Sequence, residues 1–154
     1  MRYILLLCFA MLTFAQNITV IAIPDRTNLL SVETMDSLKM ELQKELSYFK
    51  EDIQIKILPN ISADFKRNYA QKGFEYLKGV ALDNQSEALI LLEYKKGARS
   101  ILVRLFIADG TNTSKNSSVR YNKQLEKYLS EMLSDKILKL FMETGTINEN
   151  NRYL

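Results

Sequence analysis

The sequence predicts an α/β fold, a β-α-β-α-β-β-α sandwich built on a mixed sheet of four or five strands. The main observation is a pair of apolar runs of strand length, 89–95 and 100–108, on either side of a short basic turn that contains Gly97. Such a pair is typical of a β-hairpin. Both runs are mostly apolar on both faces, which indicates layers above and below them. The second observation is that strand and helix patterns alternate ahead of this hairpin, and one helix pattern follows it.

The first strand, the first helix and the second strand are expected at residues 17–24, 31–50 and 53–58. The first strand is rich in β-branched residues and ends at Pro24, which cannot donate to a strand ladder. The helix follows Ser31, a good N-cap residue. Two strands joined by a helix predict a right-handed parallel crossover. The helix is expected to turn the following apolar residues toward the core: Val32, Met35, Leu38, Leu42, Leu46 and Phe49.

A second helix is expected to begin at Ser62 and Asp64 and to continue to Val80. Its apolar residues recur at helical spacing, which favours one continuous helix. Gly73 and Gly79 lie inside this pattern, and each weakens a helix by up to about 1 kcal/mol relative to alanine.

The segment after the hairpin is polar from 109 to 122 and allows a short edge strand near 119–121. A last amphipathic helix is expected over 124–142, and Gly145 is its stop signal. This helix is expected to direct the following residues toward the core: Leu125, Tyr128, Leu129, Met132, Leu133, Ile137, Leu140 and Phe141.

Residues 1–15 have the features of a signal peptide: a basic start, a short apolar segment and small residues ahead of a cleavage site after Ala15. The apolar segment is shorter than the roughly 20 residues that a helix across a bilayer needs. We therefore expect a signal peptide at 1–15, a single α/β domain at 16–145 and a flexible tail at 146–154. The mature product is expected to be periplasmic and to contain no transmembrane segment.

The composition excludes several kinds of chemistry. The chain has no histidine, and its one cysteine, Cys8, lies inside the expected signal peptide. Ser-His-Asp and Cys-His catalysis and zinc sites built on imidazole or thiolate are therefore excluded. The five glycines form no phosphate-binding loop, and no cofactor is expected. With 21 basic and 18 acidic residues, the net charge of +3 is not that of a nucleic-acid-binding protein.

Three carboxylates are candidates for a metal site: Asp25 after the first strand, Asp83 before the third and Asp109 after the fourth. Ligands of open α/β sheets gather at the carboxyl ends of strands, so Asp25 with Asp109 could hold a hard cation such as calcium. Both are also ordinary turn residues, and we favour that interpretation.

Four basic residues in and beside the hairpin turn are candidates for partner binding: Lys95, Lys96, Arg99 and Arg104. They could attract an acidic partner or lipid headgroups. Charged hairpin turns are also common as solvated loops that discourage edge pairing. As partner surfaces we expect the fourth strand with this turn, and the polar stretch 109–121.

The order of elements resembles the amino-terminal domain of TolB and related envelope-assembly domains, which include curli-secretion and flagellar accessory proteins. The resemblance is carried by the strand at 18–23, the helix at 31–50, the strand at 53–58, the hairpin that ends in 105–111 and the closing helix at 124–142. It implies a non-enzymatic part of a periplasmic assembly, with no functional residue carried over.

A second resemblance is to the TPM domain, on Asp25, the apolar helix positions 38–46, and Asp83-Asn84 ahead of the strand 89–92. It implies acidic metal ligands, but Gln85 replaces the glycine of that pattern. We therefore predict a non-enzymatic periplasmic protein-binding domain, a scaffold or accessory of an envelope machine such as a flagellar motor or secretion system. The alternative is a TPM-type metal-dependent phosphatase or quality-control domain.

Overall fold

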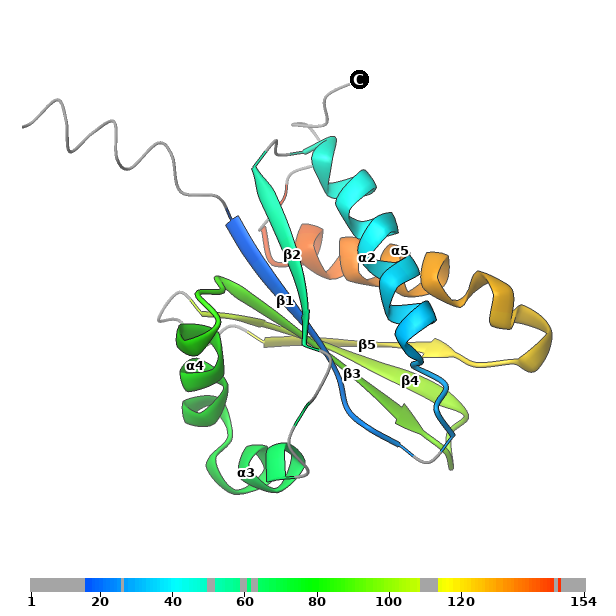
Figure 1. Ribbon diagram of the computed structural model, residues 1–154, viewed down its shortest axis with the longest axis horizontal. Helices are drawn as coiled ribbons and strands as arrows, with labels where there is room; N and C mark the ends of the chain where they lie inside the picture. The colour runs from blue at the N-terminus through cyan, green and yellow to red at the C-terminus, as the bar shows by residue number, and fades with distance from the viewer. Residues whose placement is uncertain are drawn as a thin grey trace, which may run out of the picture.

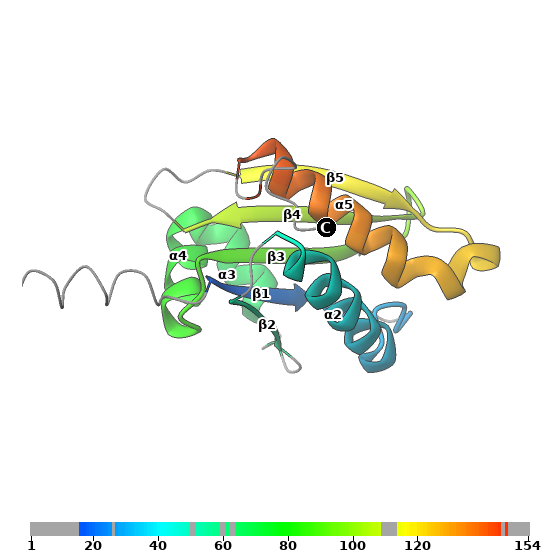
Figure 2. The same cartoon turned by 90° about the horizontal axis from the view of Figure 1, so that it is seen from above.

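The computed structural model describes residues 16–25, 27–49, 52–58, 61, 64–108, 114–145 and 147. They form one five-stranded sheet, with α2 and α5 on one face and α3 and α4 on the other (Figures 1 and 2). The predicted α/β fold class is confirmed. The elements are β1 (Gln16–Ala22), α2 (Val32–Ser47), β2 (Ile53–Leu58), α3 (Asp64–Lys72), α4 (Phe74–Asp83), β3 (Ala88–Lys95), β4 (Ser100–Ile107), β5 (Ser114–Arg120), the 3₁₀ helix η1 (Lys123–Tyr128) and α5 (Leu129–Glu143).

The strands lie in the order β2-β1-β3-β4-β5. β1 is parallel to both β2 and β3, which confirms the predicted parallel pairing of the first two strands. β4 is antiparallel to β3, and β5 is antiparallel to β4. The polar segment after the hairpin thus supplies a strand of seven residues, which is longer than the short one expected. β4, which was expected to be a partner surface, lies inside the sheet and has no free backbone edge; β2 and β5 are the edge strands.

The core has two layers that meet on β3. Ile90 and Leu92 pack with α2 and α5, whereas Leu89 and Leu91 pack with α3 and α4. Leu91 is 1% exposed, and Val103 on β4 is fully buried in the other layer. The hairpin therefore has helices on both of its faces, as its sequence predicts.

The predicted second helix is interrupted at Gly73. This residue has φ 56° and ψ −130°, a backbone conformation that residues with a side chain rarely adopt. α3 ends at Lys72, and the Gly73 N–H donates to the Tyr69 carbonyl at 2.8 Å. Because the chain changes direction there, the single continuous helix expected from the apolar pattern was wrong.

The last helix begins later than expected, at Leu129. Asn122 caps a 3₁₀ helix that precedes it, and Leu125 and Tyr128 are 41% and 44% exposed instead of buried. Their expected core positions were therefore wrong. At the start of α2, Val32 is 74% exposed, because the first residue after the Ser31 cap points away from the sheet.

The carboxyl-terminal end of α5 agrees with the predicted stop at Gly145, which has φ 74°. Ile147 lies beyond it, within the segment expected to be a flexible tail, yet it is only 6% exposed and packs with the α2/α5 layer. The rest of that tail, apart from this residue, lies outside the described residues.

The carboxyl-terminal end of α4 has a Schellman motif with an unusual residue at its turning point. The Ser86 N–H donates to the Ala81 carbonyl at 2.8 Å, and the Gln85 N–H donates to the Leu82 carbonyl at 3.1 Å. Gln85 adopts φ 54°, a position that glycine usually occupies.

We expect Gln85→Gly to raise the free energy of unfolding by about 0.5–1 kcal/mol, because the left-handed conformation strains glutamine and not glycine. Urea unfolding of the two proteins measures the difference. Gly145→Ala, at the equivalent position after α5, is the reciprocal control and should lower stability by a similar amount. A loss of stability in Gln85→Gly would mean that the exposed glutamine side chain outweighs its backbone strain.

Candidate functional site: a groove along the free edge of β2

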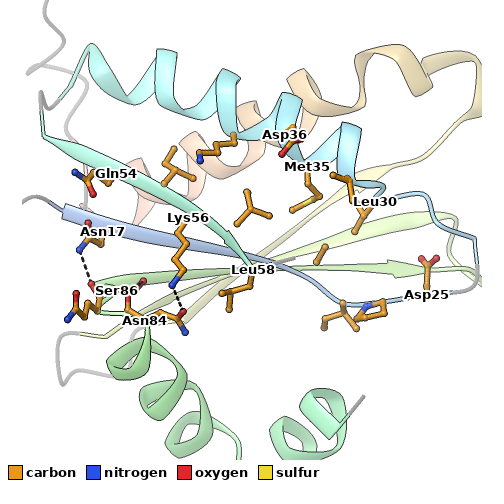
Figure 3. Close-up of a pocket in the computed structure, with 18 of the residues that line it drawn as sticks. Asn17, Asp25, Leu30, Met35, Asp36, Gln54, Lys56, Leu58, Asn84 and Ser86 are labelled. Carbon is orange, nitrogen blue, oxygen red and sulfur yellow. Dashed lines mark hydrogen bonds between the residues drawn. The ribbon is translucent and has the colours of Figure 1, made fainter. Parts of the chain in front are cut away.

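A groove of about 780 Å³ follows the outer edge of β2 (Figure 3). Residues 54–58 of β2 form its floor. Met35, Asp36 and Lys39 of α2 form one wall, and residues 84–86 after α4 form the opposite one. Residues 22–25, which extend β1 past the end of β2, close the far end.

The floor of the groove is the backbone of an edge strand. Among the described residues β2 pairs with β1 alone, so the alternate backbone N–H and C=O groups that point outward join no strand there. α2 reaches this strand at its start, where the Gln43 side chain donates to the Ile53 carbonyl at 2.7 Å. From Gln54 onward the strand edge faces the groove.

The two sides of the groove differ in polarity. Ile55 and Ile57 face α2 and join the apolar layer beneath it, together with Met35. Gln54 and Lys56 are exposed on the opposite side of the strand. The Lys56 ammonium donates to Asn84 Oδ1 at 3.0 Å, so it is held near the end of α4 (Figure 3). The groove thus combines a backbone floor, a side that carries Lys56, and an α2 side where apolar residues lie beside Asp36 and Lys39.

The wall after α4 is fixed to the sheet by polar contacts. The Asn17 side chain donates to the Gln85 carbonyl at 3.0 Å. The hydroxyls of Thr19 and Ser86, both buried, share a hydrogen bond. The Glu87 N–H also donates to the Asn17 carbonyl at 2.9 Å. This part of the groove is therefore formed before anything binds.

Asp25 and Asp83, two of the three carboxylates predicted as metal ligands, are not brought together. Asp25 Oδ1 accepts from the Thr27 N–H at 2.8 Å, the Thr27 hydroxyl at 2.6 Å and the Asn28 N–H at 3.0 Å, which makes it a turn residue. Asp83 is the exposed last residue of α4, and the adjoining Asn84 lies at the opposite end of the groove from Asp25 (Figure 3). Asp109 lies outside the described residues.

Strand direction explains why the carboxylate argument does not hold for the fourth strand. β4 is antiparallel to β3, and its last residue, Ile107, pairs with Ala88 at the start of β3. The carboxyl ends of β1 and β4 are therefore at opposite ends of the sheet. Among the residues that the structure describes, no three acidic, histidine or cysteine side chains are grouped so that they could hold a metal ion.

The four basic candidates have different surroundings. The Lys95 ammonium lies 3.0 Å from Glu93 Oε1, and the Lys66 ammonium lies 3.1 Å from the same oxygen. Burial raises the pKa of the Glu93 carboxyl, but the hydrogen bonds and charges of Lys95 and Lys66 outweigh it, so the pKa lies below its ordinary value. Lys95 therefore belongs to an ion-pair network within the fold.

Arg104 is also used inside the fold. Its guanidinium donates to the Tyr69 hydroxyl at 2.9 Å and lies 5.7 Å from the centre of the Tyr69 ring. Lys96 and Arg99 are exposed in the hairpin turn, where Arg99, rather than Gly97, has the positive φ, 48°. Those two residues are the part of the basic cluster that projects into solvent.

The sequence reasoning missed the β2 groove. Whether a strand lies at the edge of a sheet depends on which other strands pair with it. The strand's own sequence is only a weak predictor of that position. One signal was present: Lys56 is a single charge in an otherwise uncharged strand, and lysine is a common residue on strand edges.

Fold and groove together define a mixed α/β domain with an open strand edge in the groove beside β2. The structure is similar to the crystal structure of TolB from Acinetobacter baumannii, with a TM-score of 0.47 and 12% sequence identity over 84% of this chain and 29% of that chain. It is also similar to protein VC0702 from Vibrio cholerae, with a TM-score of 0.31 and 10% identity over 84% of this chain and 78% of that one.

This chain therefore spans less than a third of the TolB chain that it matches. No protein-family model matches the sequence, and neither does a curated protein. Within the described residues, none of the helices has both the length and the apolar character needed to cross a membrane.

Proposed function

We propose that this chain is an exported, non-catalytic protein-binding domain that acts as an accessory or scaffold component of a bacterial envelope assembly. The observation that carries the proposal is the groove, whose floor is the open backbone edge of β2. Backbone edges recognise other polypeptides through main-chain hydrogen bonds. The partners are accordingly other envelope proteins.

The start of β1 supports export. The predicted signal peptide ends at Ala15, and β1 begins at Gln16, the next residue. Cleavage at that site would release the domain with its first strand intact, because Gln16, the first residue after the site, is the one that pairs with Ile53 of β2. Mass spectrometry of the protein from periplasmic extract is expected to give Gln16 as the amino terminus.

A photo-crosslinking residue at position 54, on the open side of the groove, is expected to capture one envelope protein through a defined segment, because Gln54 is exposed beside the β2 edge. The crosslinked peptide is sequenced by mass spectrometry. Position 115 is the matched control, because Lys115 is also exposed on an edge strand, β5, at the other side of the sheet.

Position 96 in the hairpin turn tests the basic cluster in the same cells. Crosslinks from position 96 or 115 and none from position 54 would assign partner binding to another surface. Failure of all three positions to capture a protein, with the exported domain present at normal abundance, would contradict the proposed function itself.

A further inference from the structure

We propose that the β2 groove binds an extended partner segment as a sixth strand, and that this segment places an acidic side chain beside Lys56 and apolar side chains toward α2. The proposal rests on the proposed function and names the chemistry of the partner at the same site. It concerns a segment of another protein, and a second copy of this chain is treated as a competing outcome.

The length of the open edge sets the length of the bound segment. β2 has six residues, which span roughly 20 Å in an extended strand. Gln43 already occupies the Ile53 carbonyl at one end. At the other end, the groove continues along residues 22–25. A segment of about six residues therefore fits beside the strand.

The side chains of an added strand would alternate between the two sides of the groove, as those of β2 do. On the α2 side they would lie next to Ile57, which is half-buried, and Met35 and Leu30, which also line the groove. These neighbours favour apolar residues. The segment is therefore expected to have an apolar residue at every second position.

On the opposite side, Lys56 determines the preferred charge. It is the single charged residue of β2, and its ammonium contacts the neutral side chain of Asn84. The other charges that line the groove, Asp25, Asp36 and Lys39, come from the β1–α2 loop and from α2. Asp25 is engaged by its own turn. A carboxylate directly across from Lys56 would form an opposite-charge cross-strand pair.

The same charge disfavours a second copy at this edge. Two-fold pairing of β2 with itself would run antiparallel and, when centred on the strand, would bring the two Lys56 side chains onto the same face as close neighbours. Like charges at that separation destabilise strand pairing. A partner segment with a carboxylate has no such penalty.

The test uses two capped eight-residue peptides that both have valine at every second position. The remaining positions hold threonine and glutamate in one peptide, and threonine and lysine in the other. Each is titrated into the processed, isotope-labelled protein, and the exchange of backbone amides is followed by NMR. The glutamate peptide is expected to slow exchange at alternate β2 amides and to bind about three- to tenfold tighter than the lysine peptide, because exposed charge pairs contribute modestly.

Lys56→Glu is expected to reverse this order, and Lys115→Glu on β5 is the matched control that should leave it unchanged. Thermal unfolding of Lys56→Glu checks that the exposed substitution preserves the fold. The proposal would be overturned if the two peptides bound equally well, if neither bound, or if Lys56→Glu left the order of their affinities unchanged. Slowed amide exchange on β5 in place of β2 would also overturn it.

Dimerisation of the free protein, seen by size-exclusion chromatography together with slowed amide exchange on β2, would assign the edge to a second copy and would also overturn it. The proposed function has its own test in the crosslinking from position 54. If position 54 crosslinks to a partner but the peptide affinities do not depend on Lys56, the protein-binding function is supported and only the proposed chemistry of the bound segment is rejected.

Discussion

Leu91→Ala is expected to lower the free energy of unfolding by about 2–5 kcal/mol. Leu91 is 1% exposed on β3, the strand between β1 and β4, and it packs in the α3/α4 layer with Leu77 and Phe106. Neighbours held on both sides by the sheet and above by helices cannot collapse fully into the space left by the side chain. The cost therefore includes a cavity as well as lost apolar burial. Urea unfolding monitored by circular dichroism measures the difference.

Leu82→Ala is the matched control, because the same substitution is made on α4 at a side chain that is 78% exposed. It should change stability by less than about 0.5 kcal/mol. Val103→Ala, in the α2/α5 layer, should cost about 2–4 kcal/mol. Losses below about 1 kcal/mol at both Leu91 and Val103 would show that the hairpin is peripheral, contrary to the two-layer core.

The elements that the sequence predicted correctly are those fixed by local pattern and by the order of elements along the chain. The hairpin follows from two apolar runs around a turn, and the parallel pairing of β1 with β2 follows from the helix pattern that connects them. β5 was predicted only in part, because residues 114–118 are polar and become a strand through pairing with β4 rather than through their own preference.

The start of the last helix was mispredicted for a geometric reason. Leu125 and Tyr128 are three residues apart, and both α- and 3₁₀-helices place residues at that spacing on one side. The apolar pattern therefore continues smoothly into Leu129 and cannot show that the first turns have a different geometry. In the structure Leu125 and Tyr128 are exposed, whereas Leu129 is buried.

The candidate site was predictable only in its components. The sheet order joins the residues that line the β2 groove, which come from 17, 22–25, 28, 30, 32, 35, 36, 39, 54–58 and 84–86. Sequence reasoning assigned the binding surface to the hairpin turn, where charge is concentrated in the chain. Lys95 and Arg104 from that cluster are instead engaged by Glu93, on the same strand as Lys95, and by Tyr69 of α3.

Two glycines of the predicted second helix are expected to respond to the same substitution with opposite signs. Gly73→Ala should lower the free energy of unfolding by about 1–3 kcal/mol, because φ 56° and ψ −130° are strained for alanine. Nothing lies within 4 Å of the added methyl group, so the loss arises from the backbone alone. Gly79→Ala should raise stability by about 0.5–1 kcal/mol, because alanine is the better residue inside α4.

The two variants are compared with the wild type by urea unfolding, and far-ultraviolet circular dichroism reports their helix content. Gly79 also has nothing within 4 Å of an added methyl group, so steric overlap does not enter either comparison. A gain in both stability and helix content in Gly73→Ala would mean that α3 and α4 fuse into the one helix that the apolar pattern alone predicts. A loss at position 73 would therefore show that the packing of Phe65 and Leu77 on the sheet maintains the break, and a gain would show that Gly73 itself maintains it.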